Sequence, residues 1–326
     1  MAHTKHTKHA KSRSRNSGKS TKNTKQTKNN RPRGRSRPPA QGARRALRRE
    51  VPSIVAILTD QRDFAAMHDY RSFTFDDHAH YLRQTEGLLR SLAAQGVHTC
   101  VGLFDPDEYA DYCTDTAQNP DTPATRTRYT AEIAAGGPTV PYSGQPLELL
   151  ITQLEYETDR QATWDYATDL LSRTGSCSDC GQDIARASFD RASHALTKLL
   201  EAAGPGAHHL VCSIPAADAP LLAALHARCD DRGNVHLVQA EALVCCTVLA
   251  AGMASDSPGG VVLRTSTPGG HEEVRGWSLH DGWLHPLTEA EVFNAYCTDA
   301  ESGEPVPPEP GVTYRPGTPL PPPPAG

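Results

Sequence analysis

Two stretches, Ser53-Ile-Val-Ala-Ile-Leu-Thr-Asp60 and Val97-His-Thr-Cys-Val-Gly-Leu-Phe-Asp105, decide the fold that the sequence predicts. Each is a short, mainly apolar run that ends in an aspartate, and an amphipathic segment long enough for a crossover helix separates them. Runs that are apolar almost throughout are typical of parallel strands covered on both faces. We therefore predict a strand–helix–strand unit, whose helix begins near Thr74 in a capping-box arrangement with Asp77.

A helical insertion is expected after these strands, over about residues 106–203. It contains two short polar helices and then two longer ones, over 146–173 and 183–203. From residue 207 the pattern returns to strand–helix alternation, with a helix expected over 218–229.

The end of the fold shows an antiparallel signal. An Asp281-Gly282 pair between two apolar runs is typical of a tight hairpin, because both turn residues need positive φ. The predicted fold class is α/β, a single domain over residues 51–302 with a mostly parallel sheet, the helical insertion and a C-terminal antiparallel hairpin.

Charge is divided unequally along the chain. Residues 1–50 contain 17 of the 33 Lys and Arg and one acid, so the remainder has 16 basic and 37 acidic residues. A basic N-terminal tail of net charge +16 therefore precedes a body of net charge −21. With almost nothing to bury, this tail is predicted to be a disordered region, called here the basic arm. Counterion release would let the arm bind nucleic acid non-specifically, through Lys19, Lys22, Lys25, Lys28, Arg31, Arg33, Arg35 and Arg37.

Three alternatives compete with this interpretation of the arm. Blocks of like charge often serve only as solvated surface, so the arm could act in solubility alone. It could also fold back on the acidic body. The third alternative is that synthesis of the protein starts at Val51.

Two acids are candidates for a catalytic site. Asp60 and Asp105 each follow an apolar run, and open α/β sheets bind ligands at the carboxyl ends of their strands. Two carboxylates there could hold Mg²⁺ or Mn²⁺ in a metal-dependent enzyme. The alternative is structural, because Asp105-Pro106-Asp107-Glu108 is also a typical helix start.

The single C-x-x-C motif, Cys177-Ser-Asp-Cys180, raises the question of structural zinc. A second pair of ligands would be His226 and Cys229, which share one face if residues 218–229 are helical. A redox role is the second interpretation, since the motif precedes a predicted helix whose N-terminus would stabilise a thiolate. The third is that the cysteines are reduced structural thiols.

Residues 303–326 contain ten prolines and are predicted to form a disordered, extended proline-rich tail. Such a tail can act as a docking peptide for a protein partner with an aromatic groove. The alternative is a solvated linker.

Composition also bears on location. The longest apolar stretch, Ala242–Ala254, is too short to cross a bilayer, and no apolar segment typical of a secretory signal follows the basic start. Nine cysteines, two of them adjacent, favour reduced thiols over a secreted disulfide framework. We therefore expect a cytoplasmic protein without a membrane partner.

Three segments resemble those of uncharacterised proteins from high-GC actinobacteria, and the resemblance covers roughly residues 51–310. They are the first apolar run, Cys177-Ser-Asp-Cys-Gly181 and Gly276-Trp-Ser-Leu-His-Asp-Gly-Trp283. The resemblance implies a bacterial cytoplasm and no activity. The leading hypothesis is thus a non-enzymatic protein that associates with nucleic acid through its arm. The alternatives are the metal-dependent enzyme at Asp60 and Asp105, and an interaction scaffold that uses the proline-rich tail.

Overall fold

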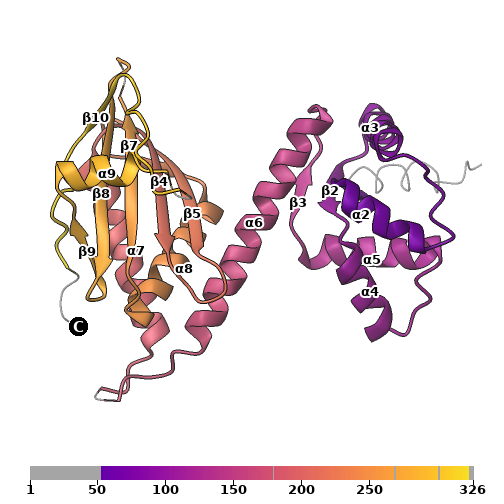
Figure 1. Ribbon diagram of the computed structural model, residues 1–326, viewed down its shortest axis with the longest axis horizontal. Helices are drawn as coiled ribbons and strands as arrows, with labels where there is room; N and C mark the ends of the chain where they lie inside the picture. The colour runs from indigo at the N-terminus through magenta and orange to yellow at the C-terminus, as the bar shows by residue number, and fades with distance from the viewer. Residues whose placement is uncertain (1–52, 179, 268, 300–301, 323–326) are drawn as a thin grey trace, which may run out of the picture. The chain divides into compact units, whose positions relative to one another are not determined.

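The computed structural model describes residues 53–322 except 179, 268, 300 and 301 (Figure 1). The predicted disorder of residues 1–50, and with it the arm's nucleic-acid-binding residues, lies outside the described residues. The first elements are β1 (Ser53–Ile57), α2 (Gln61–Ala66), the 3-10 helix η1 (Met67–Asp69), α3 (His78–Ala94), β2 (Thr99–Leu103), α4 (Pro106–Asp115), α5 (Pro123–Gly136) and β3 (Thr139–Pro141).

The strand–helix–strand prediction is confirmed for the first sheet. β1 and β2 pair in parallel, in register from Ser53 opposite Thr99 to Ile57 opposite Leu103. The sequence prediction missed β3, which adds an antiparallel edge strand to β2 and completes a small three-stranded sheet. α3 begins later than predicted, because the side chain of Asp77 caps it by accepting from His80 N.

The remaining elements build a second, larger sheet and its helices. They are α6 (Leu147–Ser172), α7 (Ile184–Ala203), β4 (Gly206–Ile214), β5 (Leu221–Cys229), β6 (Val235–Leu237), α8 (Gln239–Ser255), β7 (Gly259–Ser266), β8 (Glu272–His280), β9 (Trp283–Pro286), α9 (Glu289–Tyr296) and β10 (Val312–Tyr314). The strand order is β10-β8-β7-β4-β5-β6, with β9 paired to β8.

The prediction of a mostly parallel sheet is wrong. All pairs in the seven-stranded sheet are antiparallel except β10 with β8. The main cause is the segment predicted as a helix over 218–229, which forms β5 instead. Its alanines favour helix, but its buried residues alternate with period two and pair along the whole of β4. The inward residues are Leu221, Ala223, Leu225, Ala227 and Cys229.

Helices cover the large sheet unequally. α8 packs against β4 and β5, and α6 and α7 pack against α8, so that these three helices form a layer on one face (Figure 1). The core between this layer and the sheet includes the fully buried Leu210, Val248 and Trp277. α9 lies against β8 and β10 in a smaller cluster on the other face, around Val274 and Val292. Its N-terminus has a capping box of Thr288 and Glu291.

The predicted disorder of the proline-rich tail is also wrong for the residues described. β10 pairs with β8, and the chain then continues along the sheet past two tryptophans. Trp277 Nε1 donates to Thr318 O at 2.8 Å, and Trp283 Nε1 donates to Leu320 O at 3.3 Å. Leu320 is buried in the main core. Extended proline-rich backbone has free carbonyls, which here accept bonds from the chain's own aromatic side chains.

Candidate functional site

The acids Asp60 and Asp105 lie beyond the carboxyl ends of the paired strands β1 and β2, but each carboxylate caps a helix. Asp60 Oδ1 accepts from Asp63 N at 2.8 Å at the start of α2. Asp105 Oδ1 accepts from Asp107 N and Glu108 N, at 2.8 and 3.0 Å, at the start of α4. These bonds satisfy amides that lack partners within the helix, so they give both acids a structural role.

The surroundings of these caps are nonetheless acidic. Burial raises the pKa of Asp63, and the nearby charges of Asp60 and Asp105 raise it further. A cavity of about 390 Å³ lies beside Asp105 and is also lined by Glu108, Glu132 and Asp165. Such a lining repels anions and favours cationic ligands.

Neither of these two caps belongs to a cluster of three potential metal ligands among the described residues. Across the part of the chain that the structure describes, one group of three His, Cys, Asp or Glu side chains has ligand atoms that all lie within 4.8 Å of one another. It is on the β8–β9 hairpin and contains neither Asp60 nor Asp105.

A second cavity, called here the aromatic pocket, lies in the small-sheet region and has a volume of about 300 Å³. β1 and the ends of both parallel strands supply its floor, and α5 supplies one wall. Its aromatic lining consists of Phe73, Phe75, Tyr81 and Phe104. Tyr81 is fixed in place because its hydroxyl accepts from Leu58 N at 3.2 Å. An apolar pocket with a few polar groups is the usual form of a small-molecule site.

Arg126 supplies the positive charge of the aromatic pocket. Its Nη1 donates to Ser72 Oγ at 2.8 Å and its Nη2 donates to Ser72 O at 3.1 Å. Among the described residues no carboxylate oxygen lies within 4.0 Å of this guanidinium. The guanidinium therefore has neutral hydrogen-bond partners, and its planar fork is well suited to an anionic group. The carboxylate of Asp121, which accepts from Ser72 N at 2.6 Å, already interacts with this positive charge, because Arg126 adds to the hydrogen bonds from Ser72 in lowering the pKa of Asp121.

The structure does not bring the predicted zinc ligands together. Cys177 and Cys180 lie in the turn before α7, where Gly181 N donates to Cys177 O at 2.9 Å. Cys229 Sγ is near Leu200 O, at the far end of α7. The helix rise of about 1.5 Å per residue places these two ends roughly 25 Å apart.

His226 is separated from Cys229 for another reason. Both are on β5, and residues three apart on a strand point to opposite faces. Cys229 is buried, whereas the ring of His226 stacks on His209 with centroids 4.6 Å apart and its Nδ1 lies 3.2 Å from Glu241 Oε2. The pairing of His226 with Cys229 as zinc ligands assumed a helix over 218–229. Because this segment is a strand, the two side chains do not share a face.

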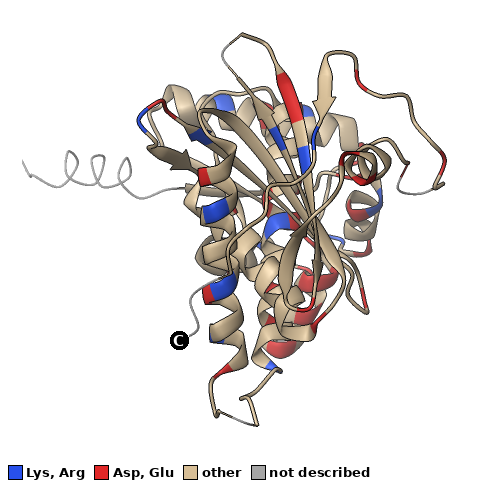
Figure 2. Cartoon of the chain, turned by 90° about the vertical axis from the view of Figure 1, so that its left-hand side faces the viewer, with Lys and Arg blue, Asp and Glu red and all other residues tan. Residues whose placement is uncertain are grey.

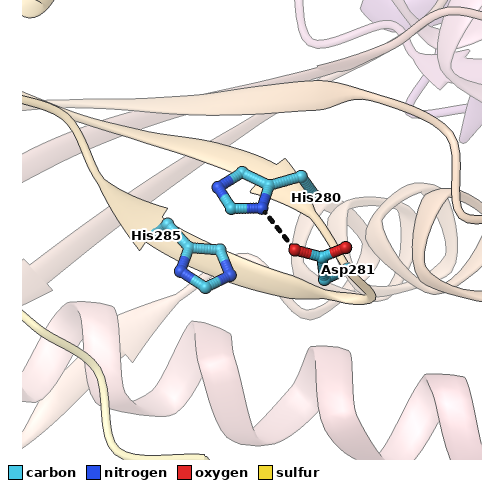
Figure 3. A group of neighbouring side chains, drawn as sticks. All are labelled: His280, Asp281 and His285. Atoms are coloured by element: carbon cyan, nitrogen blue, oxygen red, sulfur yellow. Dashed lines mark hydrogen bonds and ion pairs between the residues drawn. The ribbon is translucent and has the colours of Figure 1, made fainter.

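The hairpin group that the sequence prediction missed consists of His280, Asp281 and His285 (Figure 3). The hairpin itself was predicted from Asp281-Gly282, and it forms as expected. Its register places Ser278 opposite His285 and His280 opposite Trp283, so the two histidines are on one face of the ribbon. Applying that register to the sequence would have found the pair.

A family model described as a domain of unknown function (DUF8829) matches residues 42–145, which include the small sheet and the aromatic pocket. This match is consistent with the resemblance to uncharacterised proteins. No curated protein and no solved structure matches the chain.

No helix within the described residues combines the length and apolar character needed to cross a membrane.

Proposed function

We propose that the protein associates with nucleic acid non-specifically through its basic arm and has no enzymatic role in doing so. The observation that carries this proposal is the division of charge, +16 over residues 1–50 against −21 over the remainder. Phosphate backbones attract the first segment and repel the second. The arm is therefore the part of the chain suited to this contact.

The body's own basic residues support this division of roles. Lys198 is the only lysine after residue 28. It is paired with Glu201, and arginines such as Arg160 and Arg264 are likewise paired with acids. Figure 2 shows basic and acidic positions interspersed over the described elements. A surface of this kind does not offer a nucleic acid a continuous basic track.

The acidic body is also a competitor for the arm. Non-specific binding by basic segments gives dissociation constants of roughly 10⁻⁴–10⁻⁶ M at physiological salt. A tethered body competes at an effective concentration on the order of millimolar. Association with nucleic acid therefore requires the arm to prefer phosphates over the body's carboxylates.

A charge-neutralised variant of the full chain tests the proposal. It carries Gln at each of the eight arm positions Lys19, Lys22, Lys25, Lys28, Arg31, Arg33, Arg35 and Arg37. The matched control exchanges Lys for Arg and Arg for Lys at the same positions, which preserves charge. Fluorescence anisotropy of labelled duplex DNA and single-stranded RNA should show affinity reduced by roughly 10²-fold in the first variant and little change in the second. Equal affinity of wild type and neutralised variant would contradict the proposal.

The aromatic pocket favours a second function, the binding of a small apolar anion. The combination of four aromatic rings with a guanidinium that has only neutral hydrogen-bond partners supports it. The rings would cover an apolar body, and Arg126 would bind a carboxylate, sulfonate or phosphate attached to it.

The aromatic sulfonate 8-anilinonaphthalene-1-sulfonate has this chemistry and is a direct probe. Arg126→Gln should reduce its binding, because the pocket loses its charge but keeps its rings. Arg128→Gln is the matched control, since Arg128 is exposed on the same helix and donates to Gln118. If both variants bind the probe like wild type, the probe does not use this pocket.

The earlier alternatives have less support. Both Asp60 and Asp105 cap helices, which weakens the proposal of a metal-dependent enzyme. A scaffold that presents the proline-rich tail would first have to release Leu320 from the core. For location we propose the cytoplasm of a high-GC actinobacterium, supported by the sequence resemblance and by the burial of six of the nine cysteines.

A further inference from the structure

The β8–β9 turn holds two imidazoles and a carboxylate close together. Asp281 and Gly282 have φ of +54° and +64°, as a tight two-residue hairpin requires. His280 Nδ1 lies 3.0 Å from Asp281 Oδ2. The rings of His280 and His285 stack with centroids 3.8 Å apart and planes at 8° (Figure 3). Three potential ligands thus come from six consecutive residues of one tight hairpin turn.

A second observation, an unpartnered ring nitrogen of His285, supports a ligand at this group. Nε2 of His285 is buried and has no hydrogen-bond partner among the described residues. A buried polar atom without a partner is destabilising, because it has lost its hydrogen bonds to water. A metal ion is one species that would satisfy it, because a neutral imidazole nitrogen is a good ligand for Zn²⁺ and related cations.

The ligand types narrow the choice of metal. Imidazole suits Zn²⁺, Cu²⁺, Ni²⁺ and Fe²⁺, whereas Mg²⁺ and Ca²⁺ prefer oxygen ligands alone. Two histidines and one aspartate would leave a coordination position for water or for a further ligand. The side chains of His280 and Asp281 are 51% and 87% exposed, which gives an ion access from solvent.

Two features of the turn oppose the binding of a cation. In parallel stacked rings the nitrogen lone pairs run side by side, so one ring has to rotate before both can reach a single ion. His280 is exposed and can make this rotation. The guanidinium of Arg191 is close to Gly282, and its positive charge repels a cation at the turn.

We infer that His280, Asp281 and His285 bind a divalent cation of the Zn²⁺ class at the β8–β9 turn. The alternative is that the histidines form only a stacked cross-strand pair that stabilises the hairpin. A measurement of metal stoichiometry distinguishes the metal site from the stacked pair, since only the metal site binds one ion per chain.

Calorimetric titration of the full chain with Zn²⁺ tests the site. Other groups in the chain also bind zinc, among them His3, His6 and His9 of the arm, so the result is a difference between variants. The combination of His280→Gln and His285→Gln should lower the stoichiometry by one ion per chain. The matched control is His209→Gln with His226→Gln, which removes the other stacked pair. It should leave the stoichiometry unchanged.

A milder variant guards against misfolding of the hairpin. Asn tolerates the left-handed conformation of residue 281, so Asp281→Asn keeps the turn and removes only the charged ligand. Cu²⁺, which binds such sites more tightly than Zn²⁺, should quench the fluorescence of Trp283, the hairpin partner of His280. Asp281→Asn should weaken this quenching. Zinc stoichiometry and copper quenching that match wild type in both the double variant and Asp281→Asn would overturn the inference.

Discussion

The small and large sheets bury their strands in different ways. In the small sheet β1 is half-buried at four successive positions, Ser53 to Ala56, which fits a parallel strand covered on both faces. In the large sheet β4 and β5 alternate buried and exposed residues, which fits antiparallel strands with helices on one face. An apolar run and an alternating run are thus two distinct signals. The sequence prediction used the first for both sheets.

The comparison extends to the cores. The small sheet buries Phe64 and Tyr109 in one cluster, whereas Trp277 lies in the core of the large sheet. α6 contributes to both regions, through Leu150 beside the small sheet and Leu171 beside the large one. We expect the two sheets to respond separately to core mutations.

The largest effect should come from truncating one large aromatic residue in each core. Phe64→Ala and Trp277→Ala each remove a side chain that is 1% exposed, so each should lower the unfolding free energy by about 3–5 kcal/mol. All three tryptophans, at positions 164, 277 and 283, are in α6 or the large sheet. In thermal unfolding, Phe64→Ala should therefore shift the far-ultraviolet circular dichroism signal more than the tryptophan fluorescence. Equal shifts of both signals would show that the sheets unfold as one unit.

The packing of the proline-rich tail should have the next largest effect. Leu320→Ala removes a side chain that is 7% exposed in the main core and should cost about 2 kcal/mol, at the low end for such truncations because it lies near a chain end. Leu222→Ala is the control, since Leu222 is 58% exposed on β5. Equal stability of both variants in chemical denaturation would contradict the packing of the tail and support the disorder that the sequence predicts.

The two aspartate caps should have a smaller effect. Asp105→Ala should lower the unfolding free energy by about 1 kcal/mol, because two amides at the start of α4 lose their acceptor. Asp105→Asn keeps an acceptor oxygen and should lose less. The measurement is urea denaturation with and without Mg²⁺. If Mg²⁺ stabilises wild type but not Asp105→Asn, the carboxylate of Asp105 is a metal ligand in addition to its role as a helix cap.

The smallest effect concerns pH. Burial lowers the pKa of His208 below its ordinary value of about 6.5. The unfolded state then binds the proton more readily, so this residue's contribution is present above pH 6.5 and is lost as the pH falls below it. His208→Asn should reduce the loss of stability between pH 7 and pH 5, and His271→Asn, in an exposed turn, should not. Parallel pH profiles for wild type and His208→Asn would contradict this.

The elements that were predicted correctly from the sequence are those with a local sequence signal. The parallel pairing of β1 with β2, the long helices and the β8–β9 hairpin have local signals, namely apolar runs, helical spacing and an Asp-Gly turn. β5 has no such local signal, because its alanines favour helix and only pairing with β4 decides otherwise.

The sites follow the same rule. Asp60 and Asp105 could be placed at strand ends because their strands were identified. The zinc set could not be correct once 218–229 proved to be a strand. The aromatic pocket is lined by Phe73, Phe104 and Arg126, which come from separate segments of the chain and have no shared motif. Tertiary packing therefore determines this site, and sequence spacing alone does not.

The most direct test of the central claim is the salt dependence of duplex DNA binding by the full chain. We predict that log K falls linearly with log salt, with a slope of about −0.9 for each phosphate neutralised, and that neutralising the eight arm residues makes the slope several units shallower. This result would identify the basic arm as the nucleic-acid contact. An identical slope in wild type and neutralised chain, or no binding by either near physiological salt, would contradict it.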